Sequence, residues 1–399
     1  MLNRCPIDLP DDGAKSVPVK NSGVSMSHFT ASSYAMLREI FEQPDALART
    51  IEQYAPGTEE AALAFGSLAD SFARTGRLVI SASGSSRHAG LAAEIMIEDL
   101  AGIPVDVEYA SEYTYRSTHA LVDPGVLVIS QSGETADTLA ALREANARGL
   151  STVAITNNPG SSMAIEAAVS LPTFAGVEKA IPATKSFTAQ LAVLYSLALY
   201  LARFRGRMTL SAAEVYGTRL REIPELLALA LPAWQQAIED LAPALERSTT
   251  MLYLGRGVHY PMAREGALKL KESAYMNADG YPAGELKHGP SALISEETPL
   301  VVLAPRDVSD PDSLLRYGKV LQLTRELRQQ GRRILAIATE GDSDMQKSSD
   351  WCLFLPPTSE LLTPLLEVVP LQLLAFQLAV RRGIDVDQPR NLVKSVVAE

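Results

Sequence analysis

The chain has 399 residues, of which 47% are hydrophobic and 21% charged, and its formal net charge at pH 7 is −11. These proportions are typical of a folded protein of two or three domains and exclude a disordered or fibrous chain. A chain this acidic lacks the excess of basic residues that is typical of a nucleic-acid-binding protein, so that class of protein is not expected. Two cysteines, Cys5 and Cys352, are too few for a disulfide framework, and the five histidines show no metal-ligand spacing, so no metal site is expected.

The first 30 residues are polar and lack the apolar core of a secretory signal, so we interpret them as a mobile amino-terminal lead. The two longest apolar stretches cover 191–201 and 361–380. The first is too short to span a membrane, and the second contains Pro364, Glu367 and Pro370. Both are expected to be buried helices of a cytoplasmic protein without membrane contact.

Strand-like and helix-like segments alternate along the first half of the chain. A helical segment over 33–75 comes first, and later helices are expected at 89–100 and 135–148. The predicted strands cover 77–82, 105–110, the start of 125–133, 151–156 and 168–171. Apolar strands that alternate with helices predict an α/β fold, in which a parallel sheet is covered on both faces.

The second half repeats this rhythm after a helical connector near 203–247. Its predicted strands cover 250–254, 300–304, 333–339 and 352–355. The same spacing, 49 positions, separates Leu78 from Leu127 and Leu252 from Val301. Two copies are too few for a stacked repeat array, so the pattern indicates a duplicated α/β domain. The predicted divisions are a first domain over 31–210, a connector with the second domain over 211–375, and a tail over 376–399.

Two predicted strands of the first half end in loops rich in hydroxyl groups and glycine. The first reads Ser83-Gly84-Ser85-Ser86, and the second reads Ser130-Gln131-Ser132-Gly133-Glu134-Thr135. Because each loop precedes a helix, its backbone N–H groups and hydroxyls suit a phosphate monoester. The alternative is that these residues only cap their helices. The corresponding loops of the second half, around Arg256 and Arg306, lack the hydroxyls, so phosphate binding is expected in the first half alone.

A second group of candidate residues lies in the second half. Glu265, Lys269 and Glu272 share one face of a predicted helix, where such charges are most often a solvated surface pair. A loop bracketed by Gly284 and Gly289 holds His288, and a histidine that titrates near neutrality is able to move protons on a sugar hydroxyl. The carboxyl-terminal stretch DQPRNLVKSV contains Lys394; spacing alone does not make this lysine catalytic, but the sequence indicates a docked tail.

Four motifs in order, SQSGETADT, EGALKLKE, GELKHGP and DQPRNLVKSV, resemble the isomerase half of glucosamine-6-phosphate synthase. The resemblance covers roughly residues 30 to 399. It implies two flavodoxin-like sugar isomerase (SIS) domains, each a parallel sheet with helices on both faces, followed by a catalytic carboxyl-terminal tail. This fold agrees with the duplicated rhythm.

The resemblance also implies a site, residue by residue. The sugar phosphate would lie on Ser86, Ser130, Gln131, Ser132 and Thr135, with Gly84 and Ser85 in the same loops and the backbone of Ile181, Ala183 and Thr184 beside the sugar. Pro182 and Ala183 depart from the family pattern, in which Ala and Ser are common. Glu272 would move a proton between C1 and C2, and Lys394 would form a Schiff base with the open-chain carbonyl. His288 would open the ring from the partner subunit of a homodimer, with Lys269 and Glu265 adjusting the local charge.

The synthase begins with a glutaminase domain whose nucleophile is an amino-terminal cysteine, whereas here Cys5 follows four residues and about thirty polar residues precede the similar region. The layout therefore resembles the second type of glucosamine-6-phosphate deaminase. We expect deamination of glucosamine 6-phosphate to fructose 6-phosphate and ammonia, without a cofactor. The alternatives are ammonia-dependent synthesis or a deglycase acting on a related amino-sugar phosphate, and, from another class, a non-catalytic sugar-phosphate sensor. A sensor would be expected to have lost Glu272, His288 and Lys394.

Overall fold

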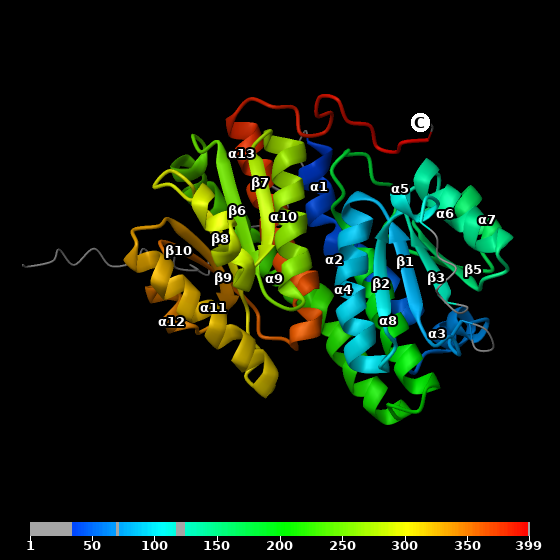
Figure 1. Cartoon of the computed structure of the whole chain (residues 1–399). Helices are drawn as coiled ribbons and strands as arrows, with labels where there is room; N and C mark the ends of the chain where they lie inside the picture. Colours follow the sequence, from blue (N-terminus) through cyan, green and yellow to red (C-terminus); the bar gives the residue numbers. More distant parts are fainter. Residues whose placement is uncertain (1–33, 69–71, 117–123, 398–399) are drawn as a thin grey trace, which may run out of the picture.

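The computed structural model describes residues 34–68, 72–116 and 124–397. The predicted amino-terminal lead and Cys5 lie outside these described residues. The described chain forms two α/β domains, each built on a five-stranded parallel sheet with helices around it (Figure 1). The α/β class and the duplicated domain, both predicted from the sequence pattern, are confirmed.

The first sheet has the strand order β2-β1-β3-β4-β5. Its strands are β1 (Leu78–Ala82), β2 (Val105–Tyr109), β3 (Gly125–Ile129), β4 (Thr152–Thr156) and β5 (Val169–Pro172). Every residue of β1, β3 and β4 is buried, as expected for central strands covered on both faces. Alternate residues of β1 enter different cores: Leu78 and Ile80 join the larger cluster, and Val79 joins a smaller cluster with residues of the helix that follows β3.

The second sheet has the strand order β10-β9-β8-β6-β7. Its strands are β6 (Thr250–Gly255), β7 (Asn277–Pro282), β8 (Leu300–Ala304), β9 (Ile334–Thr339) and β10 (Trp351–Leu355). Numbered within each domain, both sheets follow the order 2-1-3-4-5 of the flavodoxin-like fold. The sequence pattern did not predict β7, because its residues NADGYP include types that are rare in strands.

The helices carry most of the remaining chain. In the first part they are α1 (Ala35–Phe41), α2 (Gln43–Tyr54), α3 (Glu59–Gly66), α4 (Gly84–Ala101), α5 (Ala110–Tyr113), α6 (Ala136–Ala147), α7 (Ser162–Glu166) and α8 (Lys185–Phe204). In the second part they are α9 (Leu210–Leu245), α10 (His259–Ala274), α11 (Pro311–Gln329), α12 (Ser343–Lys347) and α13 (Pro364–Arg381), with short 3-10 turns η2 (Ala283–His288), η3 (Pro290–Leu293) and η4 (Glu360–Leu362). Helix α4 begins five residues before the predicted position, and α13 continues past 375, so the extended tail begins after Arg381.

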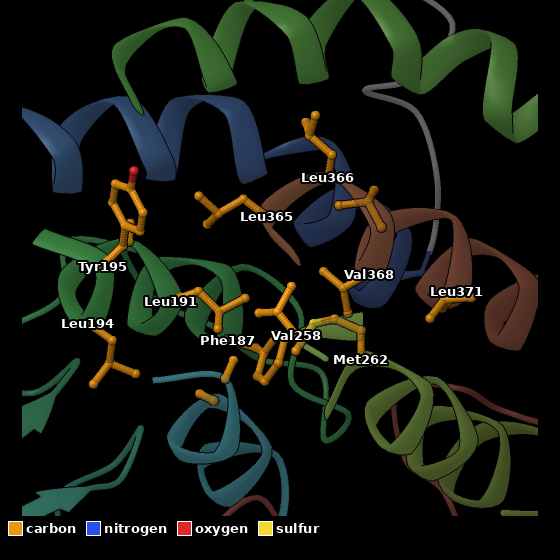
Figure 2. Close-up of a cluster of buried hydrophobic side chains, with 14 of the residues drawn as sticks. Phe187, Leu191, Leu194, Tyr195, Val258, Met262, Leu365, Leu366, Val368 and Leu371 are labelled. Atoms are coloured by element: carbon orange, nitrogen blue, oxygen red, sulfur yellow. The ribbon is translucent and has the colours of Figure 1, made fainter. Parts of the chain in front are cut away.

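Helices α8, α10 and α13 join the two domains through one continuous core. Figure 2 shows Phe187 and Leu191 of α8 beside Met262 of α10 and Leu365 and Val368 of α13. Both α8 and α13 are long and apolar enough to cross a membrane, but 83% of each apolar window is buried inside the protein. They are therefore core helices, as their sequences predicted.

Candidate active site

The loops that follow β1 and β3 meet at the carboxyl edge of the first sheet. In a sheet of this order, β1 and β3 are neighbours whose connections leave in different directions, and ligands bind in the crevice between such loops. A cavity of about 170 Å³ lies there. It is lined by Ser83, Ser85, Ser86, Ile129, Ser130, Gln131, Ser132, Thr135, Thr138, Ile181, Ala183, Lys269, Glu272, Leu392, Val393 and Lys394. The cavity thus brings together loops of the first domain, helix α10 and the carboxyl-terminal tail.

The loop after β3 holds its hydroxyl groups in a fixed arrangement. The Oγ atom of Ser130 lies 2.9 Å from Oγ1 of Thr135 and accepts a hydrogen bond from the N–H of Gly133. Gly133 has a φ of 69°, and a Cβ atom there would lie 2.0 Å from Oγ of Ser161, so only glycine fits. Thr135 is the N-cap of α6, which places these hydroxyls at a helix N-terminus. This arrangement is suited to an anion such as a phosphate.

The hydroxyls after β1 belong to the first turn of α4 rather than to a loop. The Oγ atom of Ser86 accepts a hydrogen bond from Nε2 of Gln190 at 3.1 Å, and Oγ of Ser85 donates to Oε1 of Glu265 at 2.8 Å. Gly84 begins the helix with a φ of 53° and does not line the cavity. Ser85 and Ser86 therefore connect the cavity to α8 and α10.

The three charged residues predicted to share one face of a helix lie on α10 and point into the protein. Nζ of Lys269 lies 2.6 Å from Oε2 of Glu272 and 3.4 Å from Oε1 of Glu265. The side chains of Lys269 and Glu265 are fully buried, and that of Glu272 is 21% exposed. A solvated surface pair is thereby excluded. Burial lowers the pKa of Lys269, but the carboxylates of Glu272 and Glu265 outweigh it, so the net shift is upward and the ammonium persists.

His88 completes this buried network, although sequence reasoning did not single it out. Its Nδ1 atom lies 2.7 Å from Oε2 of Glu265. Burial raises the pKa of Glu265, but Lys269, His88 and Ser85 together lower it below the usual value. The only local signal was its place three residues after Ser85, on the same face of α4. Glu265 of α10 thus connects the second domain to Ser85 and His88 of α4 in the first domain, although it does not line the cavity itself.

The tail lies against the first domain and brings Lys394 into the cavity (Figure 1). Its Nζ atom donates to Oε2 of Glu178 at 2.5 Å and to the carbonyl of Ala180 at 2.7 Å. Oγ of Ser395 lies 2.9 Å from Oγ of Ser132. The tail therefore packs on the loop after β3, and Lys394 is held in place by Glu178 and Ala180.

Asp387 anchors the beginning of the tail at α1. Its carboxylate accepts hydrogen bonds from the N–H groups of Ala35 at 2.6 Å and Met36 at 2.8 Å. Further along, the guanidinium of Arg390 lies 4.3 Å from the ring centroid of Tyr275. These contacts attach the tail to both domains.

The segment 178–184 forms the remaining edge of the cavity. Ile181 and Ala183 line it, whereas Thr184 lies behind it and donates its N–H to Glu178 at 2.9 Å. Glu39 of α1 accepts hydrogen bonds from the N–H groups of Lys179 and Ala180, which holds the segment from the other side. Neither buried glutamate was identified from the sequence, because their partners are distant in the chain.

His288 is exposed on η2 in the second domain and does not line the cavity of its own chain. Its predicted contribution from a partner subunit remains a prediction.

The corresponding strand ends of the second sheet are covered by charged pairs. The guanidinium of Arg316 donates to both carboxylate oxygens of Glu360, and a Cβ atom on Gly257 would lie 3.0 Å from Cδ of Arg316. His259 lies 2.8 Å from the buried carboxylate of Glu367. Within residues 34–68, 72–116 and 124–397, no three His, Cys, Asp or Glu side chains form a group able to hold a metal ion.

The chain is similar in sequence to known proteins. The SIS domain family model matches residues 71–200 and 244–382. Over 369 residues the chain is 44% identical to the glutamine–fructose-6-phosphate aminotransferase (isomerizing) of Chlorobaculum tepidum, covering 91% of this chain and 58% of that protein. The Zymomonas mobilis enzyme of the same name is 43% identical, covering 100% of this chain and 65% of that protein. The chain thus spans about three fifths of these relatives.

Solved structures show the same fold. The C-terminal domain of the Francisella tularensis glucosamine–fructose-6-phosphate aminotransferase superposes with a TM-score of 0.81 at 33% identity, covering 90% of this chain and 99% of that one. A glucosamine-6-phosphate deaminase from Thermotoga maritima gives a TM-score of 0.72 at 25% identity, covering 91% and 100% of the two chains. The chain therefore belongs to the SIS domain family, as a two-domain relative of the isomerase part of glutamine–fructose-6-phosphate aminotransferases.

Proposed function

We propose that the chain is an isomerising deaminase that converts glucosamine 6-phosphate and water to fructose 6-phosphate and ammonia. The observation that carries this proposal is the cavity itself. Its lining includes hydroxyl groups of the loop after β3, the carboxylate of Glu272 and the amine of Lys394, which are the groups that the proposal requires. The structural match to a glucosamine-6-phosphate deaminase over 91% of this chain supports the direction of the reaction.

Ser86, Ser130, Gln131, Ser132 and Thr135 are proposed to bind the substrate phosphate, which orients the open sugar chain toward α10. Glu272 then takes the C2 proton of the open-chain amino aldehyde and returns a proton to C1, while one proton of the amino group passes to O1, which yields an imine at C2 and an alcohol at C1. The Lys269 ammonium, 2.6 Å from Glu272, keeps this carboxylate in place.

Lys394 is proposed to complete the reaction by covalent catalysis. Its neutral amine attacks C2 of the imine, and ammonia leaves with the transferred protons. Water then adds to the lysine imine and releases fructose 6-phosphate, which regenerates the amine. No cofactor takes part in this scheme. His288, supplied by the partner subunit of a homodimer, is proposed to open the sugar ring, and we propose that the enzyme acts in the cytoplasm.

A second candidate is the isomerase part of a glucosamine-6-phosphate-forming enzyme. The 44% identity to an aminotransferase over most of this chain favours it. The same residues would then run the chemistry in reverse, with ammonia and fructose 6-phosphate as substrates.

Assays of the purified protein distinguish these candidates. Ammonia and fructose 6-phosphate are measured with a panel of hexosamine 6-phosphates, and glucosamine 6-phosphate is measured with fructose 6-phosphate plus ammonium or glutamine. The deaminase proposal predicts ammonia release from glucosamine 6-phosphate and no consumption of glutamine. Net synthesis without deamination would support the second candidate. Binding of sugar phosphate with neither reaction would indicate a sensor.

A further inference from the structure

The Lys394 ammonium contacts two oxygen atoms of the segment 178–184. The carboxylate of Glu178 lies 2.5 Å from Nζ, and the carbonyl of Ala180 lies 2.7 Å away. The lysine side chain is 25% exposed toward the cavity, whereas the Glu178 side chain is fully buried. The lysine therefore faces the cavity on one side and an acid that solvent does not reach on the other.

Glu178 is held rigidly by its own segment. Its carboxylate accepts hydrogen bonds from Oγ of Ser186 at 2.7 Å, the N–H of Ser186 at 3.1 Å and the N–H of Thr184 at 2.9 Å. Burial raises the pKa of Glu178, but Lys394 and these donors outweigh it, so the net shift is downward. The buried carboxylate is therefore ionised, and its Oε2 atom contacts Nζ of Lys394.

Two other charged groups face Glu178 from the elements packed around it. Glu39 of α1 is buried, and burial together with the Glu178 carboxylate raises its pKa. Lys269 of α10 is the other, and its ammonium interacts electrostatically with Glu178. Neither group is hydrogen-bonded to the Glu178 carboxylate among the contacts described, so Lys394 is its direct ionic partner.

We infer that Glu178 is a positioning residue for Lys394 that also accepts a proton from its ammonium when the lysine forms an imine with the substrate. The inference rests on the proposed function. The same transfer serves the C2 imine of the deamination, where ammonia leaves, and the C2 carbonyl of fructose 6-phosphate, where water leaves. With fructose 6-phosphate, whose carbonyl an ammonium cannot attack, one proton moves from Nζ to the Glu178 carboxylate and the neutral amine adds to C2. That proton and a second one from nitrogen leave with the carbonyl oxygen as water. The third stays on the protonated imine, beside the again negative Glu178.

This inference makes a prediction about pH. With an internal acceptor, proton transfer within the pair consumes no hydroxide, so the rate of imine formation is nearly constant between pH 6 and 8. In Glu178→Gln the amine must lose its proton to solvent, so the rate rises about tenfold per pH unit until the lysine is neutral. Glu178→Asp, which keeps the acid, restores the flat profile at a lower rate.

The experiment uses the full chain with fructose 6-phosphate and cyanoborohydride. The rate at which the reduced adduct appears on the Lys394 peptide is measured by mass spectrometry from pH 5.5 to 9. Glu166→Gln, on an exposed pair with Arg143, is the matched control and is expected to follow the wild-type curve. Circular dichroism confirms that each variant is folded.

The possible results separate the role of Glu178 from the imine chemistry of Lys394. Parallel profiles for wild type and Glu178→Gln would overturn the proton-acceptor role and leave the lysine chemistry intact. No adduct in the wild type would overturn the proposed Schiff base, and with it this inference. If Glu178→Gln fails to fold, Glu178→Asp carries the test: a profile that stays flat from pH 6 to 8 agrees with the acceptor role, and a rise of about tenfold per pH unit contradicts it.

Discussion

The carbonyl oxygen of Val396 accepts a 2.9 Å hydrogen bond from the N–H of Ala136, the first residue of α6. The N–H groups at a helix N-terminus have no partner within the helix, and such groups can bind a phosphate. Here the carbonyl of Val396 is the partner of one of them. Two residues before Val396 in the tail, Lys394 enters the cavity. The backbone of the tail that carries the proposed nucleophile is therefore attached to the start of α6, next to the hydroxyl groups of the loop after β3.

Removal of the tail tests whether it forms part of the active site. Deleting residues 389–399 is expected to abolish turnover while circular dichroism and the thermal transition show an intact fold, because both sheets are complete before the tail. Lys394→Arg is expected to be inactive as well, since a guanidinium stays protonated and forms no imine. Lys347→Arg, on an exposed position of α12, is the control. An active deletion variant would show that the tail is not part of the site.

Phosphate binding is predicted to depend on the hydroxyls after β3. Ser132→Ala and Thr135→Ala should each raise the KM for the sugar phosphate several-fold, because each removes a hydrogen bond to a charged group worth roughly 1–2 kcal/mol. Ser309→Ala, in the loop after β8, should leave KM unchanged. The assignment fails if the first two variants have a normal KM while changes at Gly257 or Arg306 prevent binding.

Glu272 is predicted to carry the proton between C2 and C1. Glu272→Gln preserves the shape and removes the base, so kcat should fall by about a hundredfold or more with little change in KM. Incorporation of solvent deuterium at C1 should fall in parallel. Glu326→Gln, which alters an exposed pair with Lys287, is the control. Normal turnover or normal deuterium incorporation in Glu272→Gln would exclude this role.

The ion pair between Arg316 and Glu360 predicts a dependence of stability on pH. Burial raises the pKa of Glu360, but His259 and Arg316 outweigh it and bring the pKa to about 2, below the ordinary value of 4.5. A carboxylate with a depressed pKa stabilises the fold fully above pH 4.5, and this contribution is lost as pH falls toward 2. Glu360→Gln should therefore lower the free energy of unfolding, measured with urea at pH 7, by on the order of 3 kcal/mol, and lower it much less near pH 2. An equal effect at both pH values contradicts this linkage.

The fold was largely predictable because its central strands carry their own signal. The sequences of β1, β3 and β4 are short apolar runs rich in β-branched residues, and each ends at polar or glycine residues. Strand β7 was missed for a physical reason. A Cβ atom on Gly280 would lie 2.5 Å from the backbone N of Arg264, so this strand requires glycine where α10 crosses it. The strand propensity of the residues in β7 does not show this need for glycine, because the need arises from a contact with another element.

The site was predictable where its residues follow strand ends or repeat along a helix. Ser130, Thr135, Lys269 and Glu272 meet in the cavity because of such local spacing. Glu178 and His88 were missed because their roles depend on partners far away in the sequence, Lys394 and Glu265 respectively. A buried glutamate or histidine in a helical or irregular segment has no distinguishing pattern until the tertiary structure supplies its charge partner.

The carboxylate of Asp387 that caps α1 also has a mechanical consequence. Its two hydrogen bonds to Ala35 and Met36 join the first described helix to the tail seven residues before Lys394. Glu39 of the same helix holds the N–H groups of Lys179 and Ala180, beside the carbonyl that contacts Lys394. Helix α1 therefore holds the tail and the segment 178–184 at the same time, so the position of Lys394 depends on a helix that does not line the cavity.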